Sequence, residues 1–162
     1  MNRIVERILA DTKAAMKARD KARLETLRLA MNELKNAGID KKGAQGLTDE
    51  VASPTDHLDE AEAVAVLQKL VKRRKDAAAQ FEQGGRADLA ERERAEAAVI
   101  EEYLPAGLGE AELEELVRAA IAETGATSMK EMGAVMKAAL ARAAGRADGS
   151  AVSAVVRRLL GS

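Results

Sequence analysis

Apolar residues recur every three or four positions through most of this chain, a spacing that predicts amphipathic helices. No segment has the strict alternation that is typical of a half-buried strand. We therefore expect an all-α fold. The longer segments with the helical pattern are 2–19, Leu24 to about Gly38, 59–83 and 87–103, and three shorter ones are marked by Leu113 to Ile121, Met129 to Leu140 and Val152 to Leu160.

The composition favours the same fold class. Aromatic residues make up 1% of the chain and apolar residues 47%, whereas strands usually draw on aromatic and β-branched residues. Ala, Leu, Glu, Arg and Lys, which are abundant here, are good helix formers. The chain has no Cys and one His, which excludes disulfides, a cysteine nucleophile, thiolate metal sites and multi-histidine clusters. We expect neither a metal nor a cofactor.

A stretch that holds Pro105, Gly107 and Gly109 interrupts the helical pattern. We predict a domain boundary there, with an N-terminal domain of long helices over 1–104 and a compact three-helix module over 109–162. Each helix of that module is too short to be stable alone, so the apolar faces of the three must pack on one another.

Glycines and caps mark the expected helix ends. Gly38 is predicted to be the C-cap of the second helix, and segment 40–57, which lacks periodicity, to be a loop. Asp59 and Glu62 have the spacing of a capping box at the start of the next helix. Gly133 lies inside a predicted helix, where Gly costs about 1 kcal/mol relative to Ala. We expect Gly133 to allow close approach of another helix or of a ligand.

The stretch GRADGS, which begins at Gly145, superficially resembles a glycine-rich phosphate loop. It lacks the G-x-x-x-x-G-K-[ST] spacing and a preceding strand. We interpret it as a connection in which Gly145 ends one helix in a left-handed conformation and Asp148 caps the next. Capping does not require Arg146, which lies beside a helix N-terminus where an anion can be held. Arg146 is therefore a candidate phosphate contact.

No set of residues has the pattern of a catalytic site. We expect His57 to be a solvated loop residue, because a catalytic His needs an orienting partner and a pocket. The acids from Glu110 to Glu115 begin a helix, where the macrodipole favours negative charge. Glu101 and Glu102 end a helix, and we expect them on an exposed face. We predict no catalytic residues and no autonomous enzymatic activity.

Charge is segregated along a chain whose net charge is −1. Segment 128–162 has six basic against two acidic residues, segment 109–124 has five acids and one Arg, and segment 1–35 has nine basic against five acidic residues. Such segregation can produce a basic face on a neutral protein. The candidate RNA-binding residues are Lys130, Lys137, Arg142, Arg146, Arg157 and Arg158.

A second basic run, QKLVKRRKDAA, contains five cations between Lys69 and Lys75. These residues cannot share one helical face. The run is interpreted as a solvated helix flank or as a surface for RNA or an acidic partner. Because aromatic stacking platforms are missing, RNA contacts are expected to be to phosphates and shape, and hence to depend on salt.

The longest apolar runs, such as Ala63–Leu67, are far shorter than the ~20 residues of a membrane span. The N-terminal sequence MNRIVERILADTK contains acids and lacks the apolar core of a secretory signal. We expect a cytoplasmic protein that makes no membrane contact.

Two stretches carry a resemblance to a known family. They are AVLQKLVKRRKDAAAQFEQGGRADLAERERAEAAVIEEYLP at 65–105 and TSMKEMGAVMKAALARAAGRADGSAVSAVVRRLL at 127–160. Together with residues 23–41 they look like the YqeY family, small bacterial helical proteins whose C-terminal module is similar to the tail domain of the B subunit of glutamyl/aspartyl-tRNA amidotransferase. Segment 43–57 is longer than the usual short turn of the family.

The resemblance implies two all-helical domains and a tRNA-facing role for module 109–162, since the amidotransferase tail helps to hold the tRNA. The function it implies is that of a non-catalytic, tRNA-associated protein. One alternative is an interaction module that docks on a tRNA synthetase or amidotransferase component. Another is a carbon–nitrogen ligase with glutamine as amido donor, although the phosphate ligands, Mg²⁺ ligands and activated nucleophile of such chemistry are not visible. A shared fold does not secure a shared function.

Overall fold

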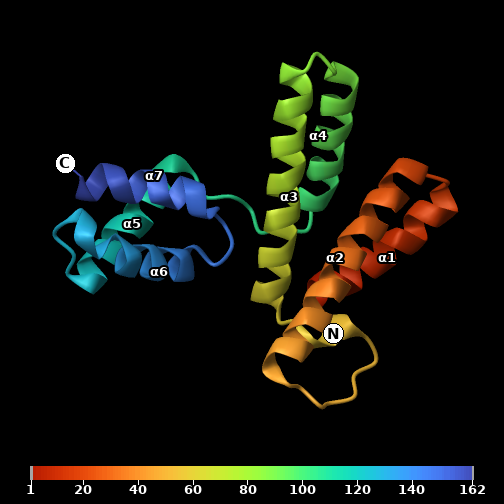
Figure 1. Cartoon of the computed structure of the whole chain (residues 1–162), viewed down its shortest axis with the longest axis horizontal. Helices are drawn as coiled ribbons and strands as arrows, with labels where there is room; N and C mark the ends of the chain where they lie inside the picture. The colour runs from red at the N-terminus through yellow and green to blue at the C-terminus, as the bar shows by residue number, and fades with distance from the viewer. Residues whose placement is uncertain (1, 162) are drawn as a thin grey trace. The chain divides into compact units, whose positions relative to one another are not determined.

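The computed structural model describes residues 2–161 and contains, over that range, seven α-helices, two short 3₁₀ helices and no strand (Figure 1). The expected all-α fold is confirmed. Contacts within the chain divide it into two compact units, one ending at Leu104 and the other beginning at Pro105. That each unit is an independently folding domain stays a prediction.

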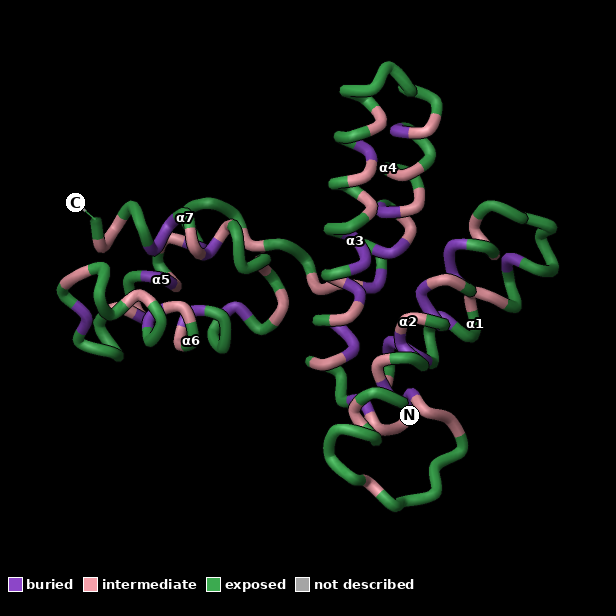
Figure 2. The backbone as a smooth tube through the Cα atoms, viewed as in Figure 1, coloured by how far each residue is buried: buried purple, intermediate pink, exposed green. Residues whose placement is uncertain are grey.

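The first unit consists of two helical hairpins joined by a short 3₁₀ helix (Figure 1). Figure 2 shows that the buried positions of these helices form stripes along one side of each, as amphipathic helices require. The largest fully buried side chains come from all four long helices and include Ile8, Leu27, Leu34, Leu67 and Ile100. The elements are α1 (Arg3–Ala18), α2 (Lys21–Gln45), η1 (Pro54–His57), α3 (Glu60–Gln83) and α4 (Ala87–Glu101).

Helices α1 and α2 are joined by a very short turn. Arg19 ends α1 in the left-handed conformation, with a φ of 55°, and Asp20 caps α2 by accepting a hydrogen bond from the backbone N–H of Arg23 at 3.1 Å. Asn2 caps α1 in the same manner through the N–H of Val5, at 2.9 Å. The polar residues at these ends therefore define where the hairpin begins and turns.

The expectation that Gly38 ends the second helix is wrong. Helix α2 continues to Gln45 and ends at Gly46, which has a φ of 62°. Gly38 is buried inside the helix because η1 crosses it there: a Cβ at Gly38 would lie 2.0 Å from the carbonyl oxygen of Pro54. A glycine followed by polar residues is an ambiguous signal, and here its role is close backbone approach.

The loop predicted over 40–57 is correspondingly shorter, because its first residues belong to α2 and its last four form η1. The capping box predicted at Asp59 is confirmed: the Asp59 carboxylate accepts from the N–H of Glu62 at 2.8 Å, and the Glu62 carboxylate accepts from the N–H of Asp59 at 2.9 Å. Lys41 Nζ donates to the same Glu62 carboxylate at 2.7 Å. This contact ties the end of α2 to the start of α3.

Tyr103, just beyond α4, anchors that end of the helix on α1. Its side chain is buried, its hydroxyl donates to the Asp11 carboxylate, and the Arg7 guanidinium lies 5.1 Å from the centre of its ring. Burial is the main cause that raises the pKa of Tyr103, followed by the hydrogen bond to Asp11 and its negative charge. Next to it, Arg23 of α2 pairs with Glu102 at 2.7 Å.

The second unit packs three helices around a small core. Fully buried residues from each of them meet there, namely Val117, Val135, Val152 and Val156. Its elements are α5 (Glu110–Thr124), η2 (Met129–Glu131), α6 (Met132–Ala143) and α7 (Gly149–Leu160). No other helix approaches Gly133, because within residues 2–161 nothing lies within 4 Å of the position its Cβ would take, and the alternative of an approaching ligand stays a prediction.

Substituting two glycines of α2 by alanine is predicted to change stability in opposite directions. Gly38→Ala forces Ala Cβ against the Pro54 carbonyl and is expected to lower the free energy of unfolding by about 1–3 kcal/mol. Gly43→Ala meets open space and is expected to raise it by about 0.5–1 kcal/mol through helix propensity. Denaturant unfolding of the three proteins measures both, and a stabilising Gly38→Ala contradicts the packing described.

Tyr103 is the only Tyr and the chain has no Trp, so phenolate absorbance follows this side chain alone. We expect a titration midpoint above the ordinary value of about 10, and a lower midpoint in Asp11→Asn. Because the pKa is higher in the folded than in the unfolded protein, the neutral phenol contributes stability below about pH 10, and this contribution is lost as the pH rises further. A midpoint near 10 while circular dichroism reports intact helices contradicts the anchored phenol.

Candidate nucleic-acid interface

The turn that contains GRADGS is a structural connection between α6 and α7. Ala144 and Gly145 both have a positive φ, of 48° and 80°, and the Asp148 carboxylate accepts from the N–H of Ala151 at 2.7 Å. Asp148 therefore caps α7 as predicted, while the left-handed stop begins one residue earlier than Gly145. The turn therefore consists of the C-terminal end of one helix followed directly by the N-cap of the next.

Arg146 has a role in this turn that the sequence did not indicate. Its Nε donates to the carbonyl oxygen of Ala106 at 3.0 Å, and its own carbonyl oxygen accepts from the N–H of Leu108 at 2.9 Å. The Arg146 guanidinium also lies 3.9 Å from the Glu112 carboxylate. Arg146 thus fastens the segment before α5 to the α6–α7 turn, and a phosphate would have to compete with these contacts.

Two more of the six candidate cations are paired within the unit. Arg142 bonds Glu123 at 2.9 Å, and Arg158 bonds Glu114 at 3.2 Å. Glu114 also bonds Arg118, and the two guanidinium groups lower the pKa of the Glu114 carboxyl. The acids of α5 therefore take up part of the positive charge that segment 128–162 carries in the sequence.

The other three candidates, Lys130, Lys137 and Arg157, are exposed. Within residues 2–161 none of their side chains takes part in a hydrogen bond or an ion pair. The nearest acid in sequence, Glu131, instead accepts from the N–H groups of Thr127 and Ser128, which lower its pKa. These three cations, from η2, α6 and α7, are the ones that the structure leaves available to an external anion.

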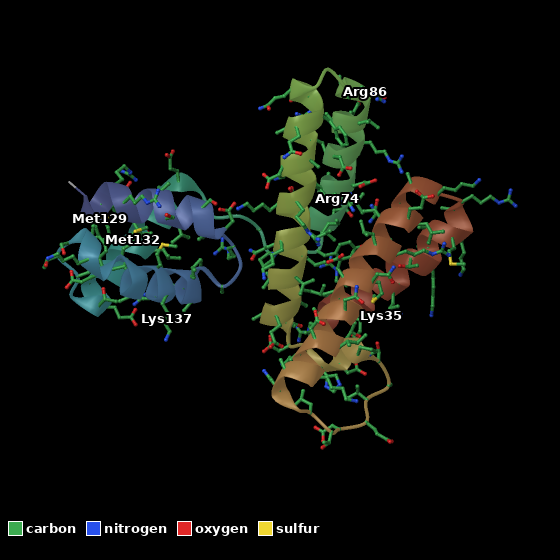
Figure 3. All side chains as sticks on the ribbon, viewed as in Figure 1. Lys35, Arg74, Arg86, Met129, Met132 and Lys137 are labelled. Carbon is green, nitrogen blue, oxygen red and sulfur yellow. The ribbon has the colours of Figure 1, made fainter. Side chains whose placement is uncertain are left out.

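One apolar side chain of η2 and one of α6, both counted in the helical apolar pattern of the sequence, are exposed. Met129 is 41% exposed and Leu140 is 40% exposed. Lys137 lies in the middle of α6, and Figure 3 labels it along with Met129 of η2 and Met132, the first residue of α6. Gly133 and Ala134 of α6 are exposed as well, and within residues 2–161 nothing lies within 4 Å of the position a Cβ at Gly133 would take.

The basic run from Lys69 to Lys75 lies on α3 and is largely neutralised inside the first unit. Arg73 bonds Glu33 of α2 at 2.7 Å, and Lys75 bonds Glu101 of α4 at 2.6 Å. Arg74, labelled in Figure 3, lies 3.2 Å from Glu93 and 3.3 Å from Glu96. Carboxylates of the same chain thus occupy most of the run.

The residues considered for chemistry have structural contacts instead. His57 ends η1, and its carbonyl oxygen accepts from Lys41 at 2.8 Å. Glu101 and Glu102 hold Lys75 and Arg23, respectively. Within residues 2–161 no group of three or more His, Cys, Asp or Glu side chains is arranged to hold a metal ion. No helix of this range is long and apolar enough to cross a membrane.

Three fungal relatives share the printed name "Altered inheritance of mitochondria protein 41, mitochondrial". The protein from Pyrenophora tritici-repentis is 30% identical over 165 aligned residues, which cover 99% of this chain and 83% of that protein. The proteins from Lachancea thermotolerans and Kluyveromyces lactis are 34% and 36% identical over 62% and 57% of this chain, and over 47% and 44% of their own lengths.

The word mitochondrial in these three names contradicts the expectation that this protein is cytoplasmic. That expectation is therefore wrong. That expectation was based on the lack of an apolar secretory core, and such a core reports on one export route only. The apolar residues Ile4, Val5 and Ile8 near the N-terminus are instead buried in the first unit.

A comparison with protein-family models matches residues 5–160 to the family described as Yqey-like protein. The match extends over both units, from α1 to the last residue of α7. It agrees with the resemblance that the helical stretches at 65–105 and 127–160 carry. The chain belongs to the YqeY family.

Proposed function

We propose that this protein binds folded RNA of the tRNA class through phosphate contacts made by its second unit, without catalysing a reaction on it. The observation that carries the proposal is the set of three exposed cations, Lys130, Lys137 and Arg157, whose side chains pair with no anion among residues 2–161. Phosphate contacts supply most of the affinity of such binding and respond steeply to salt.

The chemistry around these cations supports binding rather than turnover. Four acids of the second unit already have partners: Glu112 caps α5, Glu131 caps η2, and Glu114 and Glu123 hold arginines. Glu110 and Glu115 of α5 are exposed and their side chains have no partner within residues 2–161, and the unit has no His, Cys or Tyr to act with them. A general base or a nucleophile needs a free group within hydrogen-bond reach of its substrate. This is why we do not assign the carbon–nitrogen ligase reaction to the residues of this unit.

Recognition in this proposal depends on backbone shape rather than on base identity. The second unit has no aromatic residue, so bases cannot stack on aromatic side chains there. Lysine and arginine side chains that reach from three different elements suit a surface of phosphates with fixed geometry.

Docking on a tRNA synthetase or amidotransferase component is a second candidate function. It is favoured by the exposed Met129 and Leu140, since protein interfaces draw on apolar anchors surrounded by polar groups. If the protein docks directly on such a component, the partner recovered from native lysate stays bound after nuclease treatment. If the two proteins are joined through RNA, nuclease releases the partner.

Neutralising the three available cations is predicted to weaken tRNA binding and to flatten its salt dependence. For the variant Lys130→Gln, Lys137→Gln, Arg157→Gln, the slope of log K against log salt should fall by about 2–3, because three phosphate contacts are lost. Gln keeps helix propensity close to that of Lys and Arg. The measurement is a titration of labelled tRNA at several salt concentrations.

The matched control is Arg118→Gln, Arg142→Gln, Arg158→Gln, which removes the same charge from paired positions of the same unit. We expect a smaller change of slope for it. No binding by the unsubstituted protein at about 50 mM salt, where phosphate contacts are strong, refutes the proposal.

A further inference from the structure

Helix α2 carries four cations at regular intervals along one face. Lys21, Arg28, Lys35 and Lys42 follow one another at steps of seven residues, and all four are exposed. Figure 3 labels Lys35 on this helix. Seven residues are close to two helical turns, so the four side chains form a stripe that shifts only about 20° per step. We call these four residues the α2 stripe.

The side chains of the α2 stripe are unpaired in the part of the chain that the structure describes, as are those of Lys13, Lys17, Lys69 and Lys72 in the first unit, but only the stripe places four such cations at regular steps along one helix. Within residues 2–161, no ion pair or hydrogen bond involves its side chains. On the same helix, Arg23 pairs with Glu102 and Lys41 with Glu62, both at 2.7 Å. Pairing is thus the rule where α2 meets its neighbours, and the stripe lies outside those contacts.

The dimensions of the α2 stripe suit an extended polyanion. At 1.5 Å per residue the cations are spaced about 10 Å apart and span about 30 Å in total. A stretch of that length with repeated single charges matches a run of backbone phosphates on a folded nucleic acid. A small anion, by contrast, needs several donors that converge on one point.

The residues between the cations argue against a helical protein partner and against a lipid surface. The intervening positions on this side are Glu25, Asn32 and Ile39. Only Ile39 offers a large apolar side chain, 54% exposed, whereas helix docking needs apolar anchors on successive turns and a membrane-surface helix needs a whole apolar face. The opposite side of α2 is already buried in the core by Leu27, Leu34 and others.

We propose that the α2 stripe is a second phosphate-binding surface for folded RNA, separate from the cations of the second unit. The proposal takes its class of ligand from the function proposed above, and adds that the N-terminal hairpin contributes its own set of contacts. Each of the four cations then neutralises one phosphate and releases counterions independently of the second unit.

The test compares four proteins in tRNA titrations over a range of salt. They are the unsubstituted chain, the stripe variant (Lys21→Gln, Arg28→Gln, Lys35→Gln, Lys42→Gln), the second-unit variant (Lys130→Gln, Lys137→Gln, Arg157→Gln) and a control variant. The control, Arg73→Gln, Lys75→Gln, Arg86→Gln, Arg94→Gln, removes four paired cations from the first unit. Circular dichroism of each checks that the helices are intact.

The stripe variant is expected to lower the slope of log K against log salt by about 3–4, with the control close to the unsubstituted chain. A stripe variant that binds like the control overturns the inference. If the second-unit variant alone loses slope, the inference fails and the function proposed for the second unit stands. If the stripe variant alone loses slope, the inference stands and the second-unit proposal fails.

A parallel titration with poly-L-glutamate separates RNA from an acidic protein as occupant. Loss of polyglutamate binding in the stripe variant, with tRNA binding unchanged, overturns the assignment to RNA. The assignment to RNA is supported if the stripe variant loses tRNA binding and all four proteins bind polyglutamate only weakly.

Discussion

The structure depends on the close approach of helices whose contact faces are lined by small side chains. Alanines are buried in every long helix of the first unit and in α5 and α6 of the second. Small residues at a helix contact shorten the distance between axes, so backbone groups come near one another. Gly38 under the Pro54 carbonyl is the extreme of this arrangement. Because few large side chains are buried, the position of each helix depends strongly on the contacts at its two ends.

Polar side chains hold those ends, and this decides which charges remain on the surface. Asn2, Asp20, Asp59 and Asp148 each accept a hydrogen bond from an N–H in the first turn of a helix. Other acids, such as Glu33, pair with cations of a neighbouring helix. Several acids are used where elements meet, whereas outward-facing cations such as Lys35 and Lys137, like the outward-facing acids Glu6 and Glu115, have no side-chain partner within residues 2–161. The unpaired cations of both units therefore follow from the same packing that stabilises the fold.

Periodicity and cap chemistry were enough to predict the fold class, most helix positions and the caps at Asp59 and Asp148, because these are local properties of the chain. The C-cap expected at Gly38 and the neighbouring helix expected at Gly133 were wrong for one reason. A glycine inside a helix is required only where a segment distant in sequence packs against it. The residues next to the glycine in the sequence do not indicate whether such a segment is present. The contact of Arg146 with Ala106 was not predictable for the same reason, because the two residues lie 40 positions apart in the sequence.

The candidate interface was predictable in the same partial way. Charge counting found the basic segment 128–162 and cannot separate Arg142, which meets Glu123, from Lys137, which meets no acid. The seven-residue spacing of the α2 stripe, in contrast, is visible in the sequence once the helix is known to continue past Gly38. The C-cap wrongly placed at Gly38 left Lys42 outside the predicted helix. The predicted helix therefore did not include the last residue of the α2 stripe.

The near-zero net charge of the chain constrains how such surfaces can work. A net charge of −1 gives little long-range attraction, and at physiological salt each charge is screened over about 8 Å. Cations about 10 Å apart along α2 therefore act nearly independently. Binding by either surface then increases with the number of cations that meet phosphates at once. A folded RNA with phosphates fixed in space satisfies that condition at a lower entropic cost than a flexible strand, which must be ordered on binding. Under the proposed function, the two surfaces would select an RNA by its shape, because each phosphate contact is indifferent to base sequence.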